Sequence, residues 1–595
     1  MEVIRIPSVL KNILRNLETS FIAHTCRLVN SDWNHESCSI LQDRIPINFT
    51  TYDQLVRFTN IFETFNEGTS ITFNSFRFSS DLFASAIQDR AFGTLKRLNN
   101  ALDRCVTIWG EKVTNLEVTL YPIYPLEDDA LHTSTVLMYE HLIKMLYSSF
   151  PNIMHLKILF LISNSQAVPE DFDVNAFMEP YSQLVLPKIE RLTIEVAARE
   201  DGNTESLSES ENIIITFMKV ILASAVHLKS FTSSNVPLGK EKIVQDCIFN
   251  NFSQISPSLR ELNVLLHVKT DEDMQIFSKG LPNLQHVQLE IDSSNVTPET
   301  LRDFFSHHSK SLRTLSLRFL DAIHSSLVYP ILPLGVCLGQ LSNLCLEQYN
   351  GSLNFRHLPN LDSLTLKHSK LKGIFSSMRL HQHNTNVLSG GNESVKLSIK
   401  ELTIGAGCKI QNDNGMGISS AQEFLATVIP CFDNLSSLKV SNFVLPLPLI
   451  FRHCTKLKVL SILKCDGVTD IVLSGNSRTL LEAMSLMDFG KMDELFMEEG
   501  ESLHAVKPEV NEFIKSLNSR SGFKDEAFVG CLKDLQFLEI EGEISDKAVL
   551  YGIMQCERLK TLKLHTNLIS WRGQRIIQCT LKDLVKFEVF VRRNK

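Results

Sequence analysis

The sequence has 595 residues, of which 44% are hydrophobic and 21% charged, so it can bury a large core. Its length corresponds to about four ordinary domains or to one extended array of repeats. The 25 Gly and 19 Pro are too few for a disordered or collagen-like chain, and the net charge of −8 gives no general attraction to nucleic acid or to an anionic membrane.

No segment has the pattern of a signal peptide or of a membrane span. Charged residues such as Glu2 and Lys11 interrupt the apolar positions near the start, and the most apolar stretch, 327–341, contains Pro330 and Pro333. The 13 cysteines are odd in number and form no Cys-x-x-Cys pair, which argues against a disulfide scaffold. We therefore expect a protein of the cytoplasm, with the nucleus left open.

Residues 6–34 predict short helices. Pro7 suits a first helical turn. An apolar stripe at helical spacing follows it, formed by Leu10, Ile13, Leu14 and Leu17. A second helix would carry Phe21, Ile22, Cys26 and Val29, and Trp33 would anchor a third. Three such helices are too small for a stable core of their own, so we expect them to pack on something else.

This stretch resembles the F-box, which has Leu-Pro followed by spaced Leu and Ile positions and a later Trp. Ile6 replaces the usual Leu, and Val9 stands where an acidic residue is frequent. The resemblance implies docking on a Skp-family adaptor, and through it on a cullin, by a surface formed or supported by Pro7, Leu10, Ile13, Leu14, Leu17, Val29 and Trp33. The alternative is a helical cap that closes the first repeat of an array.

The rest of the chain repeats the pattern apolar-x-x-apolar-x-apolar. Clear copies begin at Ile189, Leu259, Leu284, Leu312, Leu361, Ile399, Leu435, Leu457, Leu481, Leu535, Leu559 and Leu584, and weaker ones at Val113, Ile153, Leu228 and Leu341. Many starts lie about 20–30 residues apart, which is the spacing of leucine-rich repeats. Each copy predicts a short strand with two inward apolar residues, and neighbouring copies must stack to bury them.

Several return segments between the strands have helical signals. Pro298 to Phe305 follows Thr297 as a predicted N-cap, and residues 421–428 follow Ser420 in the same way. The copy at Leu457, with Cys465 and Thr469-Asp470, resembles the cysteine-containing subtype of leucine-rich repeat that is common in the F-box leucine-rich family. We interpret Cys465 as a small buried hydrophobe.

The expected fold is α/β: a short three-helix F-box at residues 1–42, then a leucine-rich-repeat solenoid, a horseshoe of strand–helix repeats, at residues 43–595. Its repeats are irregular to about residue 250 and clearer over 256–591. Loop insertions are predicted near 197–212, 381–420 and 490–524, the last with a helix over 508–517.

Residues that flank the inward strand positions are expected on the concave face. That column comprises Thr314, Ser316 and Arg318; Ser363, Thr365 and Lys367; Ser437, Lys439 and Ser441; Thr561, Lys563 and His565. Its basic and hydroxyl bias, interrupted by Glu539 and Glu541, suggests a polar or acidic protein ligand held by Arg318, Lys367, Lys439 and Lys563. The alternative is an ordinary solvated sheet face.

No nucleotide-binding, hydrolase or zinc-protease motif occurs, and no basic patch carries interleaved aromatic residues. The close histidine pairs, His307-His308 and His381-x-His383, lack a matching Cys or acidic cluster. We therefore expect no catalytic residues, no metal and no cofactor.

Together the two resemblances imply the substrate-recognition subunit of a Skp–cullin–F-box (SCF) ubiquitin ligase, which acts by proximity to an unknown protein substrate. The alternative is a leucine-rich-repeat scaffold or inhibitor without a ligase link. A third interpretation, an enzyme built on the repeats, has no motif in its support.

Overall fold

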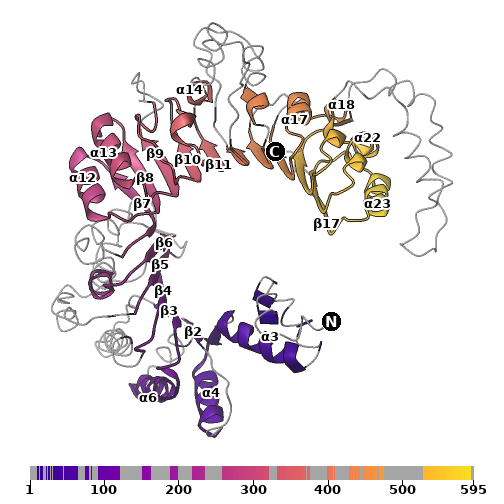
Figure 1. Ribbon diagram of the computed structural model, residues 1–595. Coiled ribbons are helices and arrows are strands. Elements are labelled where there is room, and N and C mark those ends of the chain that lie inside the picture. Colours follow the sequence, from indigo (N-terminus) through magenta and orange to yellow (C-terminus); the bar gives the residue numbers. More distant parts are fainter. Residues whose placement is uncertain are drawn as a thin grey trace, which may run out of the picture. The chain divides into compact units, whose positions relative to one another are not determined.

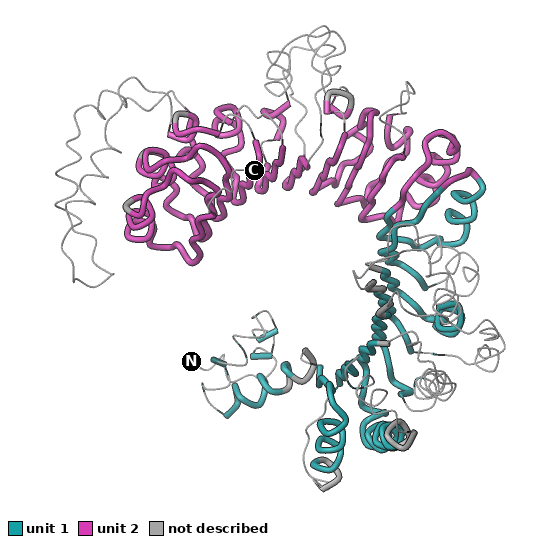
Figure 2. Tube along the Cα trace, turned by 180° about the vertical axis from the view of Figure 1, so that it is seen from behind, with its two compact units in different colours: residues 1–268, 272–288 teal, residues 269–271, 289–595 magenta. Residues whose placement is uncertain are grey.

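The structure is a computed structural model, and two compact units divide the chain. The first comprises residues 1–268 and 272–288, and the second residues 269–271 and 289–595 (Figure 2). The residues described are 10–11, 14–15, 17, 22, 25–26, 29, 31–44, 46–64, 74–79, 82, 92–120, 146, 150–162, 186, 188–198, 218–234, 258–320, 331–369, 371–375, 398–405, 408, 428–432, 434–442, 447–465, 468–474 and 527–590.

The first unit is a parallel sheet in which each strand pairs with the next one along the chain. Its strands are β1 (Ile47–Phe49), β2 (Ser75–Phe78), β3 (Asn115–Leu120), β4 (His155–Ile162), β5 (Arg191–Ala198), β6 (Ser230–Ser234) and β7 (Glu261–Val268). Its named helices are α3 (Ser31–Arg44), α4 (Tyr52–Thr64) and α6 (Phe92–Trp109). The helix α12 (Asp271–Gly280) and the strand β8 (His286–Asp292) lie where the chain passes from one unit to the other.

The second unit repeats this arrangement, again with parallel pairing of consecutive strands (Figure 1). Its strands are β9 (Thr314–Leu320), β10 (Asn343–Glu347), β11 (Ser363–Lys367), β12 (Glu401–Ile404), β13 (Ser437–Ser441), β14 (Val459–Leu463), β15 (Phe537–Glu541), β16 (Thr561–His565) and β17 (Lys586–Phe590). Its α-helices are α13 (Pro298–His308), α14 (Leu371–Ile374), α17 (Leu447–His453), α18 (Asp470–Ser474), α22 (Asp546–Tyr551) and α23 (Trp571–Thr580). Single 3₁₀ turns are η6 (Phe355–His357), η7 (Ile429–Cys431), η9 (Val529–Cys531) and η10 (Ile553–Gln555).

The repeated apolar pattern predicts the strands correctly. Every copy contains a strand except the one at Leu481, which lies outside the described residues. In β11, Leu364 and Leu366 are both fully buried and stand in register with Leu344 and Leu346 of β10. Burial of one such leucine side chain contributes about 1.5–3 kcal/mol. The weaker copies, such as Ile153 in front of β4, are therefore true units, and the parallel α/β solenoid arrangement is confirmed within each unit.

Two strands were missed by the sequence analysis. The buried residues of β1 and β2 are phenylalanines, Phe49, Phe76 and Phe78, and neither strand belongs to a copy that begins with Leu, Ile or Val. Their rings pack together, with centroids 5.5 Å apart for Phe49 and Phe76. Aromatic side chains here do the packing that leucines do in later strands.

The return segments differ in length and structure. The prediction for α13 is confirmed: Thr297 is the N-cap, its side chain accepts from Thr300 N–H, and Pro298 begins the helix. The shorter return between β10 and β11 holds only the 3₁₀ turn η6. The helices predicted over 421–428 and 508–517 lie outside the described residues, apart from Val428.

The strands fix where two of the predicted insertions lie. Ala197 and Ala198 belong to β5, where they pair with Leu161 and Ile162, so the expected loop cannot begin at residue 197. The strand β12 lies inside the range 381–420, as the copy at Ile399 predicts, and its Leu402 and Ile404 fill the core between β11 and β13. The insertion at 490–524 lies outside the described residues.

Aspartates at helix starts connect successive return segments. Asp470, the first residue of α18, accepts hydrogen bonds from Ser545 N–H (2.7 Å) and from the Ser545 hydroxyl (2.5 Å). Ser545 is in turn the N-cap of α22. The same cap link, from an aspartate to the next cap residue, joins Asp271 to Thr297 and Asp546 to Ser570.

Candidate functional site: the open face of the second unit

Side chains that flank the buried strand residues form rows on the opposite face of the sheet, here called the open face. The middle row comprises Ser316, Cys345, Thr365, Thr403, Lys439, Ser461, Glu539, Lys563 and Glu588, which are neighbours in register. The end row, nearer the strand ends, comprises Arg318, Glu347 and Lys367, then Ser441 and Leu463, then Glu541, His565 and Phe590. The column expected from the sequence lies in these rows and in the preceding row of Thr314, Ser363, Ser437 and Thr561.

Arg318 is held between two glutamates. Its Nη1 lies 3.0 Å from Glu290 Oε2, and its Nε lies 3.5 Å from Glu347 Oε1. Glu290 is almost completely buried, so the arginine compensates a carboxylate that has lost most of its water. Arg318 therefore has a structural partner that a ligand would have to share.

Lys367 and Lys439 are more accessible to a ligand than Arg318. Both side chains are exposed, on β11 and β13, and neither forms an ion pair with a residue that the structure describes. Lys367 lies next to Glu347 in the end row, whereas the middle-row neighbours of Lys439 are Thr403 and Ser461. Of the four predicted ligand-binding residues, these two fit that role best.

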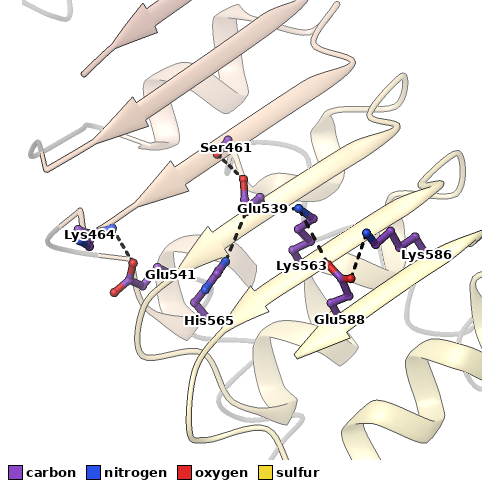
Figure 3. A network of polar contacts seen from close by, with 8 residues as sticks. All are labelled: Ser461, Lys464, Glu539, Glu541, Lys563, His565, Lys586 and Glu588. Carbon is purple, nitrogen blue, oxygen red and sulfur yellow. Dashed lines mark hydrogen bonds and ion pairs between the residues drawn. The ribbon is translucent and has the colours of Figure 1, made fainter. Parts of the chain in front are cut away.

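Lys563 belongs to a polar network on the last strands (Figure 3). Its Nζ lies 3.9 Å from Glu539 Oε1 and 4.0 Å from Glu588 Oε2. Glu539 also accepts from the Ser461 hydroxyl at 2.9 Å, and its Oε1 lies 3.4 Å from His565 Nε2. Glu539 thus joins three strands, β14 to β16, across the open face.

Aromatic rings border this network. Lys563 Nζ lies 5.7 Å from the centre of the Phe537 ring, and His565 stacks on Phe590 with centroids 4.6 Å apart. Phe590 remains substantially exposed. A surface that combines fixed charges with exposed aromatic rings has the composition of a protein-binding patch.

The first unit has its own alternating charges. Arg77 Nη2 lies 2.6 Å from Glu117 Oε2. Lys157 Nζ lies 3.6 Å from Glu117 Oε1 and 3.0 Å from Glu195 Oε2. Exposed pairs of this kind contribute about 0–1 kcal/mol each, so they fix the arrangement of charges more than they stabilise the fold.

The basic bias inferred from the sequence does not hold for the complete rows. Glu347 on β10 separates Arg318 from Lys367, and Glu588 on β17 lies beside Lys563. These acidic residues were missed because the column was read from only some of the repeats. The same reading of the copies at Leu341 and Leu584 would have found them.

The N-terminal residues form a small apolar cluster. Its buried members are Leu10, Leu14, Ile22, Cys26, Ile40 and Leu41, with Leu17 and Trp33 packed against them. The helix α3 contains Trp33 and continues to Arg44, past the boundary expected at residue 42. It contacts β2 in the same unit, so this helix connects the N-terminal cluster to the first repeats.

The seven predicted adaptor-binding residues are placed differently. Leu10 and Leu14 are buried inside the cluster, so they would support a binding surface without touching a partner. Val29 is 55% exposed, and Leu17 and Trp33 are half-buried. Pro7 and Ile13 lie outside the described residues.

The buried side chains of Cys465 and His308 are packed inside the fold. Cys465 is buried with its Sγ 3.4 Å from the carbonyl oxygen of Leu463, as its interpretation as a small buried residue requires. His308 is completely buried against Phe304, and burial, with His307 beside it, lowers the pKa of its imidazole to about 4. Neither ring nitrogen of His308 has a hydrogen-bond partner among the residues that the structure describes.

In the described ranges, no group of three or more His, Cys, Asp or Glu side chains is arranged to hold a metal ion. None of the helices that the structure describes is long and apolar enough to cross a bilayer. His381 and His383 lie outside these residues.

The strand pattern, the parallel register and the rows of outward side chains define the class: a parallel α/β repeat protein of the leucine-rich kind. No protein-family model and no curated protein matches the sequence. Among solved structures, a leucine-rich-repeat protein of Leptospira interrogans matches over 82% of this chain and 98% of its own, with 13% identity and a TM-score of 0.33. A similarity this low supports no functional conclusion, so the class rests on the repeats of this chain.

Proposed function

We propose that the chain is a non-catalytic protein-interaction scaffold whose open face binds a protein partner. The observation that carries this proposal is the register of the outward side chains, which places charges, hydroxyls and aromatic rings in fixed rows over consecutive strands. Side chains held by neighbours, as Glu539 is by Ser461, lose little conformational freedom on binding. Alternating charge favours a partner of matching pattern over one of uniform charge.

The more specific proposal is that this scaffold is the substrate-recognition subunit of an SCF ubiquitin ligase. It rests on the F-box resemblance, and it is supported by the packed N-terminal cluster and by the exposure of Val29. The cluster would bind a Skp-family adaptor, and through it a cullin, while the open face holds the substrate. The chain would then need no catalytic residue or cofactor, because raising the local concentration of target and ubiquitin-loaded enzyme is sufficient.

The adaptor is tested by pull-down with the purified Skp-family protein and the full chain. Val29→Asp changes an exposed residue of the N-terminal segment, outside the buried cluster, and should abolish binding while the fold is kept, as judged by circular dichroism. Ile61→Asp, at a residue of similar exposure on α4, is the matched control and should bind like the wild type. If the adaptor does not bind the wild-type chain, the ligase proposal is refuted. The N-terminal cluster is then interpreted as a cap that closes the first repeat.

The open face is tested separately, so that the scaffold proposal can stand without the ligase. Lys367→Glu combined with Lys439→Glu should reduce the recovery of wild-type interaction partners at least tenfold in quantitative affinity purification. Lys400→Glu, at an exposed lysine paired with Asp362, is the control and should leave recovery unchanged. Equal recovery with both variants would mean that the open face is only a solvated surface.

A further inference from the structure

Among the strands that the structure describes, β17 is the last of the second unit and has one unpaired edge. It pairs with β16 on its other side, and it cannot pair with β2, because β1 and β3 occupy both edges of that strand. Leu562 and Leu564 of β16 are fully buried, whereas Phe587 and Val589, at the same positions of β17, are only half-buried. Val585, just before the strand, is 85% exposed. Apolar side chains on an unprotected edge strand are a site where another strand can add.

The backbone of β17 has hydrogen-bonding groups available at this edge. Val585 N–H and Lys586 N–H both donate to the carbonyl oxygen of Lys560, and the carbonyl oxygen of Phe590 accepts from Thr566 N–H. Lys586, Glu588 and Phe590 therefore turn their backbone groups toward β16. Because successive residues of a strand alternate in direction, Phe587 and Val589 turn theirs toward the open edge.

Two copies of this edge are complementary to each other when they pair in antiparallel orientation. In an antiparallel pair of two β17 strands centred on Phe587, Lys586 of each copy lies opposite Glu588 of the other. In the same register Val585 lies opposite Val589, and the two Phe587 residues lie opposite each other. A register centred on Glu588 would instead place two carboxylates opposite each other, which is unfavourable. Of these two registers the charges favour the one centred on Phe587, and in it the backbone groups of Phe587 also face their partners.

We propose that two copies of this chain associate through antiparallel pairing of their β17 edges, centred on Phe587. Lys586 and Glu588 lie on the open face (Figure 3), where their side chains are 3.0 Å apart within one copy and can re-pair across the two-fold axis. Phe587, Val589 and Val585 extend the apolar core from one copy into the next. A two-fold contact of this kind uses the same surface twice and leaves the rest of each open face free.

This association goes beyond the proposed function and does not depend on it. Two linked copies present two open faces, so a partner with two binding segments gains affinity without any new contact. The chain can dimerise without binding an adaptor, and it can bind an adaptor without dimerising. The two proposals therefore fail independently.

The test is sedimentation velocity of the full chain over a range of micromolar concentrations. Wild-type protein should show a monomer–dimer equilibrium. Lys586→Glu and Glu588→Lys each place like charges opposite each other at both symmetric positions and should raise the dissociation constant at least about tenfold. Lys400→Glu is the matched control because Lys400 also forms a 3.0 Å pair and is similarly exposed.

Charge rescue makes the test specific for this register. The double variant Lys586→Glu with Glu588→Lys restores opposite charges and should dimerise like the wild type. A mixture of the two single variants should form heterodimers, because both cross-pairs are then Glu with Lys. Val585→Lys, at a residue too exposed to matter for folding, should give a monomer. A monomeric wild-type chain, or a dimer that survives the single charge reversals, would overturn the proposal.

Discussion

Gly573 and Asp546 form a coupled pair whose disruption can be predicted in detail. Asp546 links two return segments by accepting from Ser570 N–H at 2.9 Å and from the Ser570 hydroxyl at 2.5 Å. Gly573, in the first turn of α23, lies so close that an added Cβ would overlap the Asp546 carboxylate. Gly573→Ala should therefore push the carboxylate away from Ser570.

The expected loss of stability follows from the two hydrogen bonds that Asp546 accepts from Ser570. A net hydrogen bond to a charged group contributes about 1.5–3 kcal/mol, and these groups are only half-buried, so we expect Asp546→Ala to cost about 2–3 kcal/mol. Gly573→Ala should cost about 1–2 kcal/mol, because the steric displacement outweighs the gain of about 0.5–1 kcal/mol from replacing glycine in a helix.

The double variant decides whether this reasoning is right. Without the carboxylate at residue 546, the Cβ at residue 573 meets no obstacle from it, so Gly573→Ala should become neutral or stabilising. The assay is urea unfolding of the wild type, both single variants and the double variant, with Asp534→Ala at an exposed aspartate as control. A Gly573→Ala effect of the same size and sign in both backgrounds would refute the coupling.

Three further outcomes are expected. His308 has its pKa lowered to about 4 by burial, so the unfolded state binds more protons between pH 6.5 and 4. Stability should thus be full above pH 6.5 and fall by about 3 kcal/mol toward pH 4, and thermal unfolding of His308→Phe should lose this dependence. Burial raises the pKa of the Cys454 and Cys556 thiols to about 12, so alkylation followed by mass spectrometry should label exposed Cys337 first, and equal labelling would contradict this. Leu366→Ala should cost about 2–5 kcal/mol in denaturant unfolding because it empties a fully buried site between β10 and β12, and a cost below 1 kcal/mol would show that the core is loosely packed there.

Local patterns made much of the fold predictable. The start of α13 could be predicted because Thr297 and Pro298 act within one helical turn, and the strands could be predicted because each carries its own two buried residues. The strand β2 was missed although Phe73-x-x-Phe76-x-Phe78 has the same spacing. All three of its apolar positions are phenylalanine, whereas every copy that was recognised has Leu, Ile or Val at its first position.

Features that depend on contacts between residues far apart in the chain could not be predicted from the sequence. The hydrogen bond from Ser461 to Glu539 joins residues far apart in the chain, and the cap link from Asp470 to Ser545 does the same. Neither has a local signal, because both depend on β14 and β15 being neighbours in the sheet. The burial of Glu290 under Arg318 also requires the strand register before it can be recognised.

The spacing of the end row has a consequence for the geometry of a ligand. Adjacent strands lie about 4.8 Å apart, whereas an extended peptide advances about 3.3 Å per residue, so two strand intervals match three peptide residues. Arg318 on β9 and Lys367 on β11 are two intervals apart, with Glu347 between them. An extended segment lying across the strands would therefore meet both cations with acidic residues at positions i and i+3. The spacing of the strands therefore sets the number of residues between the charges of a peptide that can bind there.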